Sequence, residues 1–372
     1  MGRFFAIFER DLRRFLRNPI VVLMSVLMPI IYLVILGNSF QGELKNLPVA
    51  VVDMDNGPYA GKVWELLRSI EAGPRTFRLH RALDQGIAMQ GLRDGVFKAV
   101  LIIPDGFGRD AGKRAGPSLG LFLDNTETVS ALSIRAAISR ALPELGRDVL
   151  VREARGIPAL REIEIYKKID YDQTLIPGVV IMAIFLGAMT TGAFNIVMDR
   201  FLGTEESYLL TPLTKRDIVM GLVLSGLLIT TIIAAVVLFL SSLISGIALW
   251  SAMTWEGAAL TASIVMLSTL GLQGLMFVFM GRVSHPRIVG VLGGFLNVIL
   301  FFPSGAIYPV ESFPSWLKAF SAINPETYSV HALRAVLFKG EGFHAVAADM
   351  GYLAVFAFVL LGLGILSFKR GL

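Results

Sequence analysis

Six runs of apolar residues, each 18 to 24 residues long, dominate the sequence. A helix needs about 20 such residues to cross the hydrocarbon core of a bilayer, and a helix satisfies its own backbone hydrogen bonds there. The composition agrees, with 54% hydrophobic and only 17% charged residues. The sequence therefore predicts an α-helical polytopic membrane protein with six transmembrane helices, at residues 20–37, 175–198, 218–240, 258–280, 288–307 and 346–368.

Positive residues at the ends of these runs predict the orientation, because Lys and Arg accumulate on the cytoplasmic side. One set of flanks carries Arg3, Arg10, Arg13, Arg14, Arg17, Arg200, Lys215, Arg216, Arg282, Arg287, Lys369 and Arg370. The short loops on the other side carry only Lys318, Arg334 and Lys339. We expect a multi-pass protein of the bacterial cytoplasmic (inner) membrane with both termini in the cytoplasm.

The first 18 residues place Phe4, Phe8, Leu12 and Phe15 at helical spacing between arginines. This pattern is typical of an amphipathic cytoplasmic helix in the headgroup layer. An ordinary basic flank that orients insertion explains the same residues equally well. A cleaved signal peptide is disfavoured, because no small-x-small cleavage site follows the first apolar run.

Residues 38–174 are far less apolar and long enough for a domain of their own, which we expect outside the cytoplasm. Short β-branched runs predict strands, and the segments between them predict helices, which together give an inserted α/β extracytoplasmic domain. The expected strands are 48–53, 99–104 and 119–124, and the expected helices are 59–70, 83–92 and 127–155, the last interrupted at Pro143. The expected division is 1–18 interfacial helix, 19–37 first transmembrane helix, 38–174 domain, and 175–372 the other five transmembrane helices.

Nothing in the sequence indicates an enzyme active site, a metal site or a cofactor site in this chain. There is no cysteine, the four histidines lack zinc-ligand spacing, and no serine lies in a Gly-x-Ser-x-Gly motif. Gly61-Lys62 and Gly112-Lys113 lack the rest of a phosphate loop. The cluster Asp53, Asp55, Asn56 and Gly57 favours a strand-to-helix turn over a cation site. The net charge of +5 comes mostly from the membrane flanks, so nucleic acid is not an expected partner.

The charged loop at residues 199–217 separates the second and third apolar runs. Gly203 and Thr204 can open a short helix, Glu205 and Glu206 suit its first turn, and Pro212 closes it. Thr214 and Asp217 have the spacing of a capping box for the next helix. The loop is either a contact surface for a cytoplasmic partner or an ordinary connection with ordinary caps.

A second distinctive stretch, residues 303–340, follows the fifth apolar run. Pro303, Gly305 and Pro309 should break the helix near the outer leaflet, where irregular backbone persists only if protein or water satisfies it. We expect an outer re-entrant segment there. Tyr308 and Trp316 suit an interfacial anchor.

Both stretches resemble those of type-2 ATP-binding-cassette (ABC) exporter permeases that carry a large domain between helices one and two. The coupling loop of that family is similar to this chain at Arg200, Gly203, Thr204, Glu205, Glu206, Leu209, Leu210, Thr211 and Pro212. The outer gate of the family is similar at Pro303, Ser304, Gly305, Pro309, Trp316, Asn324, Pro325 and Tyr328. The chain departs from the pattern at Phe201, Tyr208 and Glu326, the last of which stands where an apolar residue is usual.

The resemblance implies the transmembrane permease subunit of an ATP-driven exporter for an amphipathic or hydrophobic substrate such as a drug or lipid. It implies a separate ABC ATPase subunit that holds MgATP, and a second permease chain, either a copy or a sister. A periplasmic adaptor and membrane lipids are further expected partners.

Two other functions remain open from the sequence alone. A non-transporting membrane anchor could present the outer domain to envelope partners. An ion-driven secondary transporter is disfavoured, because Asp199, Glu256 and Asp349 lie near the ends of the runs and no run has a charged centre.

Overall fold

The computed structural model describes residues 3–39, 44–73, 75–111, 117–150, 159–164, 169–204, 211, 213–247, 253–281 and 283–367. The chain divides into two compact units. One unit comprises Met1–Ser39, Leu175–Ile307 and Ala319–Leu372, and the other comprises Phe40–Thr174 and Tyr308–Lys318. We call them the membrane unit and the α/β unit.

Among the described residues, the membrane unit is a bundle of six helices long and apolar enough to cross a membrane, which confirms the predicted fold class. The first, third, fourth, fifth and sixth spans are α2 (Pro19–Ser39), α11 (Lys215–Ile244), α13 (Trp255–Met280), α14 (Pro286–Phe301) and α17 (Phe343–Ser367). The second span runs through α8 (Ile176–Ala188), a π-helical turn η1 (Met189–Phe194) and α9 (Asn195–Phe201). It is also the most buried of the six, so it lies at the centre of the bundle.

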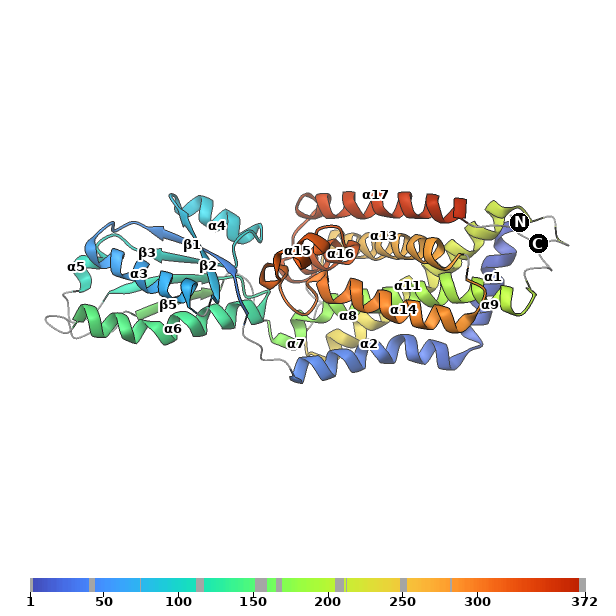
Figure 1. The fold of residues 1–372 in the computed structure, drawn as a ribbon, viewed down its shortest axis with the longest axis horizontal. Helices are drawn as coiled ribbons and strands as arrows, with labels where there is room; N and C mark the ends of the chain where they lie inside the picture. The colour runs from blue at the N-terminus through green and yellow to red at the C-terminus, as the bar shows by residue number, and fades with distance from the viewer. Residues whose placement is uncertain are drawn as a thin grey trace. The chain divides into compact units, whose positions relative to one another are not determined.

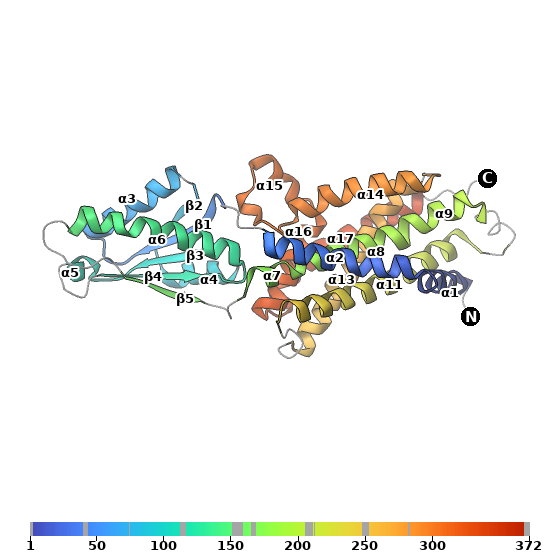
Figure 2. The same ribbon diagram turned by 90° about the horizontal axis from the view of Figure 1, so that it is seen from below.

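Two shorter sets of helices complete the membrane unit. The N-terminal helix α1 (Arg3–Leu16) lies across one end of the bundle, where α9 also ends (Figure 1, Figure 2). We call this the α1 end and the opposite one the far end. Between the fifth and sixth spans, α16 (Pro325–Arg334) and the π-helical turn η4 (Ala335–Lys339) pack against α13 and α17. The helix α15 (Ser315–Ser321) precedes them in the chain, and its residues up to Lys318 belong to the α/β unit.

Close helix packing in the bundle depends on glycine at particular positions. At Gly274 of α13, a Cβ atom would lie 2.6 Å from the backbone nitrogen of Leu361 on α17. At Gly187 of α8, it would lie 2.7 Å from Oγ1 of Thr230 on α11. Small residues let helix backbones approach closely where lipid provides no hydrophobic driving force. These two glycines therefore bring α13 against α17 and α8 against α11.

The α/β unit contains a five-stranded sheet with the order β2-β1-β3-β4-β5, made of β1 (Leu47–Asp53), β2 (Phe77–Ala82), β3 (Ala99–Ile103), β4 (Ser118–Leu123) and β5 (Ala159–Glu164). All neighbouring strands are parallel except β3 and β4. Along β1, Val49 and Val51 face the core formed with α3 (Pro58–Ala72) and α6 (Thr128–Leu150). Ala50 and Val52 face α4 (Gln85–Arg93) on the other side, as the two-residue period of a strand requires. The short helix α5 (Phe107–Ala111) follows β3.

The expected strands at 48–53, 99–104 and 119–124 are present as β1, β3 and β4, within one residue at each end. The expected interruption at Pro143 was wrong, because α6 continues through it to Leu150. Its buried face, which includes Ile134 and Ile138, packs against the sheet and offsets the one hydrogen bond that proline removes. The strands β2 and β5 were missed.

The segment Tyr308–Lys318 groups with the α/β unit although it follows the fifth span. Tyr308 packs against the core of that unit. The Nζ atom of Lys98 lies 3.0 Å from Oε1 of Glu127 and 3.2 Å from Oε1 of Glu311, and the Lys98 side chain is only 7% exposed. Burial lowers the pKa of Lys98, but Glu127, Glu311 and Asp124 outweigh it and raise that pKa above its ordinary value. This ion cluster holds the segment to the unit.

Candidate coupling surface

The loop between the second and third spans begins where α9 ends. Of the predicted coupling residues, Glu205, Glu206, Leu209, Leu210 and Pro212 lie outside the described residues. Gly203, Thr204 and Thr211 are exposed. Gly203 has a φ of +69°, in the left-handed region that favours glycine, and its N–H donates to the carbonyl of Arg200.

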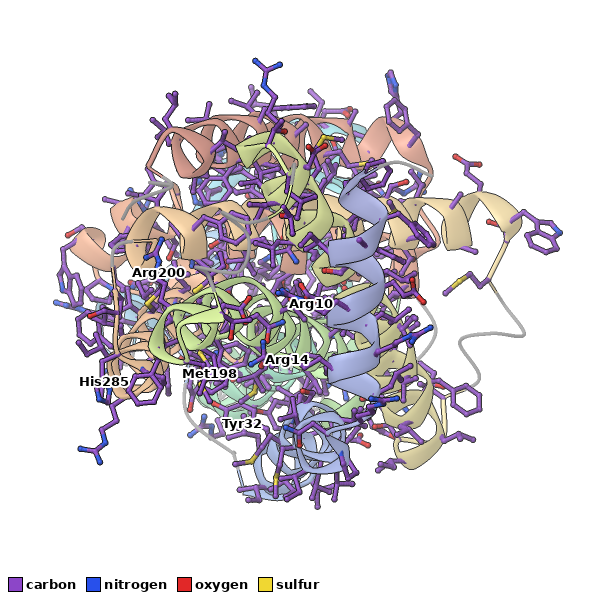
Figure 3. All side chains as sticks on the ribbon, turned by 90° about the vertical axis from the view of Figure 1, so that its right-hand side faces the viewer. Arg10, Arg14, Tyr32, Met198, Arg200 and His285 are labelled. Atoms are coloured by element: carbon purple, nitrogen blue, oxygen red, sulfur yellow. The ribbon has the colours of Figure 1, made fainter. Side chains whose placement is uncertain are left out.

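Arg200 holds the end of α9 to the connection between α13 and α14. Its Nη1 atom donates to the carbonyl of Gly281 and, at 3.5 Å, contacts that of Val283. The neighbouring Phe201 ring lies 5.1 Å from the ring of His285 at the start of α14. Figure 3 labels Arg200 and His285 at this end of the bundle. Arg200 therefore positions two connections at the α1 end and is itself partly buried.

The other end of the loop is fixed by a capping box, as the sequence predicts. The Thr214 side chain accepts from the Asp217 N–H at 3.3 Å, and the Asp217 carboxylate accepts from the Thr214 N–H at 2.9 Å. Two backbone donors at the start of α11 are satisfied in this way. The loop thus leaves one capped helix and enters another.

A buried charge cluster joins α1 to α9, and sequence reasoning missed it. Asp199 is 5% exposed and Asp11 is 1% exposed. Arg10 bridges the two carboxylates, with Nη2 at 2.7 Å from Asp11 and 3.0 Å from Asp199. The Nη1 atom of Arg14 lies 2.8 Å from Oδ1 of Asp199. We call Arg10, Asp11, Arg14 and Asp199 the α1–α9 charge cluster, and Figure 3 shows Arg10 and Arg14 extending from α1.

The α1–α9 charge cluster also contacts α11. The Ser225 hydroxyl on α11 donates to Asp11 at 3.3 Å. Burial raises the pKa of Asp11, and Arg10 and Ser225 offset this only in part. Next to it, Ile7 is buried against Gly221 of α11, where a Cβ atom would lie 2.6 Å from Cβ of Ile7. The face of α1 that packs on the protein therefore centres on Ile7 and Asp11 and not on the phenylalanines.

The residues predicted for the outer gate lie in both units. Trp316 is 71% exposed and belongs, with Pro309, to the α/β unit. The other predicted gate residues lie in the membrane unit: Pro303, Ser304, Gly305, Asn324, Pro325 and Tyr328. Whether they form a gate stays a prediction.

The predicted helix break after the fifth span is confirmed. The helix α14 ends at Phe301, and Gly305 has a φ of +83° after a short 3-10 turn. Side chains satisfy the freed carbonyls: Nδ2 of Asn324 donates to Leu300 at 2.6 Å, and Ser321 donates to Pro303 at 2.7 Å. Protein groups thus stabilise irregular backbone at this depth, as hydrocarbon surroundings require.

The spanning helices of the described residues, with an α/β insertion after the first, define a polytopic membrane protein. The chain belongs to the family described as ABC-2 family transporter protein, whose model matches residues 19–366. The resemblance stated from the sequence is thereby confirmed at the level of the family.

The relatives agree with this membership. The chain is similar to the probable multidrug ABC transporter permease YbhR of Escherichia coli (strain K12), with 23% identity over 350 residues, 91% of this chain and 90% of YbhR. It is 21% identical over 341 residues to the inner membrane transport permease YhhJ of the same organism, which covers 88% of this chain and 87% of YhhJ. The ABC transporter G family member 20 of Dictyostelium discoideum is 22% identical over 374 residues, 95% of this chain and 49% of that protein.

This chain is therefore the transmembrane permease subunit of an ABC transporter, and ATP is hydrolysed by a separate ATPase chain. The alternatives of a non-transporting anchor and of an ion-driven carrier are replaced by this assignment. Six spans and bacterial permease relatives indicate a multi-pass protein of the inner membrane.

Proposed function

We propose that the chain exports an amphipathic or hydrophobic substrate from the inner membrane, with force applied to loop 199–217 by an ABC ATPase that binds MgATP. In this proposal the α1 end and both termini face the cytoplasm, which the distribution of Lys and Arg supports. The α/β unit then lies in the periplasm, where an adaptor protein is the partner class that we propose for it.

The observation that carries the proposal is that both ends of the loop are fixed to the bundle. Asp199 joins α9 to α1, and Arg200 joins α9 to the connection between the fourth and fifth spans. The capping box fixes the start of the third span. Force applied near the exposed residues Gly203, Thr204 and Thr211 would therefore reach four spans and α1 through these contacts, as transmission of a rigid-body movement requires.

Cross-linking tests whether the ATPase docks on this loop. The chain has no cysteine, so single-cysteine variants are specific. Thr211→Cys, at an exposed position of the loop, should cross-link to the co-expressed ATPase through a short bifunctional reagent. Trp255→Cys, 93% exposed at the far end, is the matched control and should give no adduct. Adducts at position 255 but not at 211 would reverse the proposed orientation and overturn the docking site.

The proposal includes a second permease chain, and we propose that α14 forms the contact with it. An exposed apolar stripe with alternating spacings of three and four residues runs along this helix at Ile288, Val291, Phe295 and Val298 and continues directly after it at Phe302. Gly290 and Gly294 are four residues apart beside it, with no atom within 4 Å of a Cβ built at either. Open glycines at this spacing favour close contact between two helices in a membrane.

Oxidative cross-linking of single cysteines on α14 tests this assignment. Val291→Cys should form a disulfide-linked permease pair in membranes, because the stripe would face its counterpart across the interface. Ile232→Cys, 51% exposed on α11, provides the lipid-facing control. A linked pair of the same chain indicates a homodimer, and a link to a different permease indicates a paired assembly. Equal linking at both positions, or none at Val291→Cys, contradicts the assignment.

A further inference from the structure

A buried acidic residue lies deep in the bundle, on a short helix that is not one of the six membrane spans. Glu326, in the first turn of α16, is 1% exposed. Neither of its carboxylate oxygens has a hydrogen-bond partner among the residues that the structure describes. An ionised carboxylate without a partner in an apolar interior is costly, and acids at such depth commonly mark an ion or substrate path.

Two contacts fix the depth of this acid. One turn further along α16, Ser329 hydrogen-bonds at 2.7 Å with Ser268 of α13. Ser268 lies 13 residues from the start of α13 and 12 from its end, so about 18 Å of helix separate it from the α1 end. Asn324, just before Glu326, donates to Leu300 in the last turn of α14, which has only 16 residues. Glu326 therefore lies near the middle of the fourth span.

From this point, polar groups follow the contact between α13 and α16 towards the far end. Gly257 near the start of α13 approaches η4, because a Cβ there would lie 3.7 Å from Cγ1 of Val336. Thr261 is four residues after Gly257 and seven before Ser268, so it lies on the same helical stripe. Its hydroxyl is buried and has no hydrogen-bond partner among the described residues. We call Glu326, Ser329, Ser268 and Thr261 the polar seam.

The polar seam ends at a pocket of about 320 Å³ between α13 and η4, lined in part by Glu256, Gly257, Val336, Lys339 and Glu341. Oε1 of Glu256 accepts from the Phe343 N–H at 3.1 Å. On α16, His331 contacts Asp349 at 2.7 Å, and the Nη2 atom of Arg334 donates to the Gly305 carbonyl. The pocket itself has two carboxyl groups, Glu256 and Glu341, against one ammonium group, Lys339. The seam thus has a carboxyl group at its deep end and another at its mouth.

We propose that the polar seam is a binding site for a lipophilic cation, in which Glu326 supplies the counter-charge and the hydroxyl groups guide the cation to the pocket beside Glu256. The inference rests on the proposed function, whose cargo class it narrows to amphipaths that carry a positive charge. A cation in the seam provides the partner that the Glu326 carboxylate lacks. Removal of that charge should then affect cationic cargo far more than neutral cargo.

Covalent labelling tests the site without any need for export. Dicyclohexylcarbodiimide reacts with carboxyl groups buried in membranes, and mass spectrometry locates the adduct. In the full-length permease in nanodiscs, Glu326 should be labelled, and Glu326→Gln should lack that adduct. Methyltriphenylphosphonium, a lipophilic cation, should slow labelling at least about tenfold. Triphenylphosphine oxide, which has similar size and no net charge, should slow it less than about twofold.

Three results overturn the proposal: no labelling of Glu326, equal protection by both compounds, or no protection by either. Labelling of the exposed Glu256 serves as the internal control for reagent access. Because no ATPase or nucleotide is present, this test can fail while ATP-driven export stands, and it can succeed while ATP-driven export fails.

Discussion

Asp199→Asn should reduce ATP-driven export at least about tenfold while the ATPase still docks on the loop. The Asp199 side chain is 7% exposed and pairs with Arg10 and Arg14, so loss of its charge leaves two partly buried guanidinium groups without their shared partner. Removal of one member of a fully buried pair costs 3–5 kcal/mol. The arginine side chains are 30% and 35% exposed, so water offsets part of this, and we expect about 2 kcal/mol.

Glu9→Gln on α1, the helix that carries the arginine partners of Asp199, is the matched control. Glu9 pairs with Arg13 across one helical turn, but both side chains are exposed, at 45% and 66%. Exposed pairs of this kind contribute only about 0.3–0.5 kcal/mol, so export should stay within twofold of the wild type. Docking is measured by the Thr211→Cys cross-link in each background. If Asp199→Asn and Glu9→Gln reduce export equally, the α1–α9 charge cluster has no part in coupling.

Gly203→Pro should abolish most ATP-driven export, because proline fixes φ near −65° where this residue has +69°. The substitution also removes the N–H that donates to the Arg200 carbonyl at 3.1 Å. The chain must then leave α9 in another direction, which under the proposed docking displaces the loop from the ATPase. Gly203→Ala, which keeps the N–H and costs about 1 kcal/mol at positive φ, should give an intermediate loss.

The chain offers a close control for this substitution at the far end of α11. Gly246 also has a positive φ, +64°, and its N–H donates to the Leu243 carbonyl at 3.3 Å. Gly246→Pro imposes the same local strain away from the proposed docking site, so export should remain within about twofold of the wild type. Equal loss in both proline variants would attribute the effect to general damage and would remove the support for coupling through the loop.

The six spans could be predicted from the sequence because a helix in lipid must be long and apolar, and both properties can be read directly from the residues. Features that depend on neighbouring residues could also be predicted, such as the Thr214 and Asp217 capping box and the helix break near Pro303. The strand β2 was missed because it is an edge strand whose residues Arg78, His80 and Arg81 are exposed, so no apolar run marks it.

Contacts between distant parts of the chain could not be predicted from the sequence alone. Arg14 and Asp199 are 185 residues apart, and each had an adequate local explanation as a membrane flank. Glu326 was noted only as a departure from a family pattern. Its depth depends on the folding of α16 back against the middle of α13, which no periodicity reveals. The central carboxyl group that the six spans lack belongs to a helix that is not one of them.

Export by purified permease and ATPase in sealed vesicles is the most direct test of the proposal that a separate motor acts through loop 199–217. The vesicles carry the ATPase on their outer face, a fluorescent amphipathic dye and MgATP are added outside, and accumulation of the dye in the lumen is followed. We predict export that requires both chains and nucleotide, and that Gly203→Pro stops while Gly246→Pro does not. Dye accumulation at the same rate without the ATPase chain would contradict the proposal.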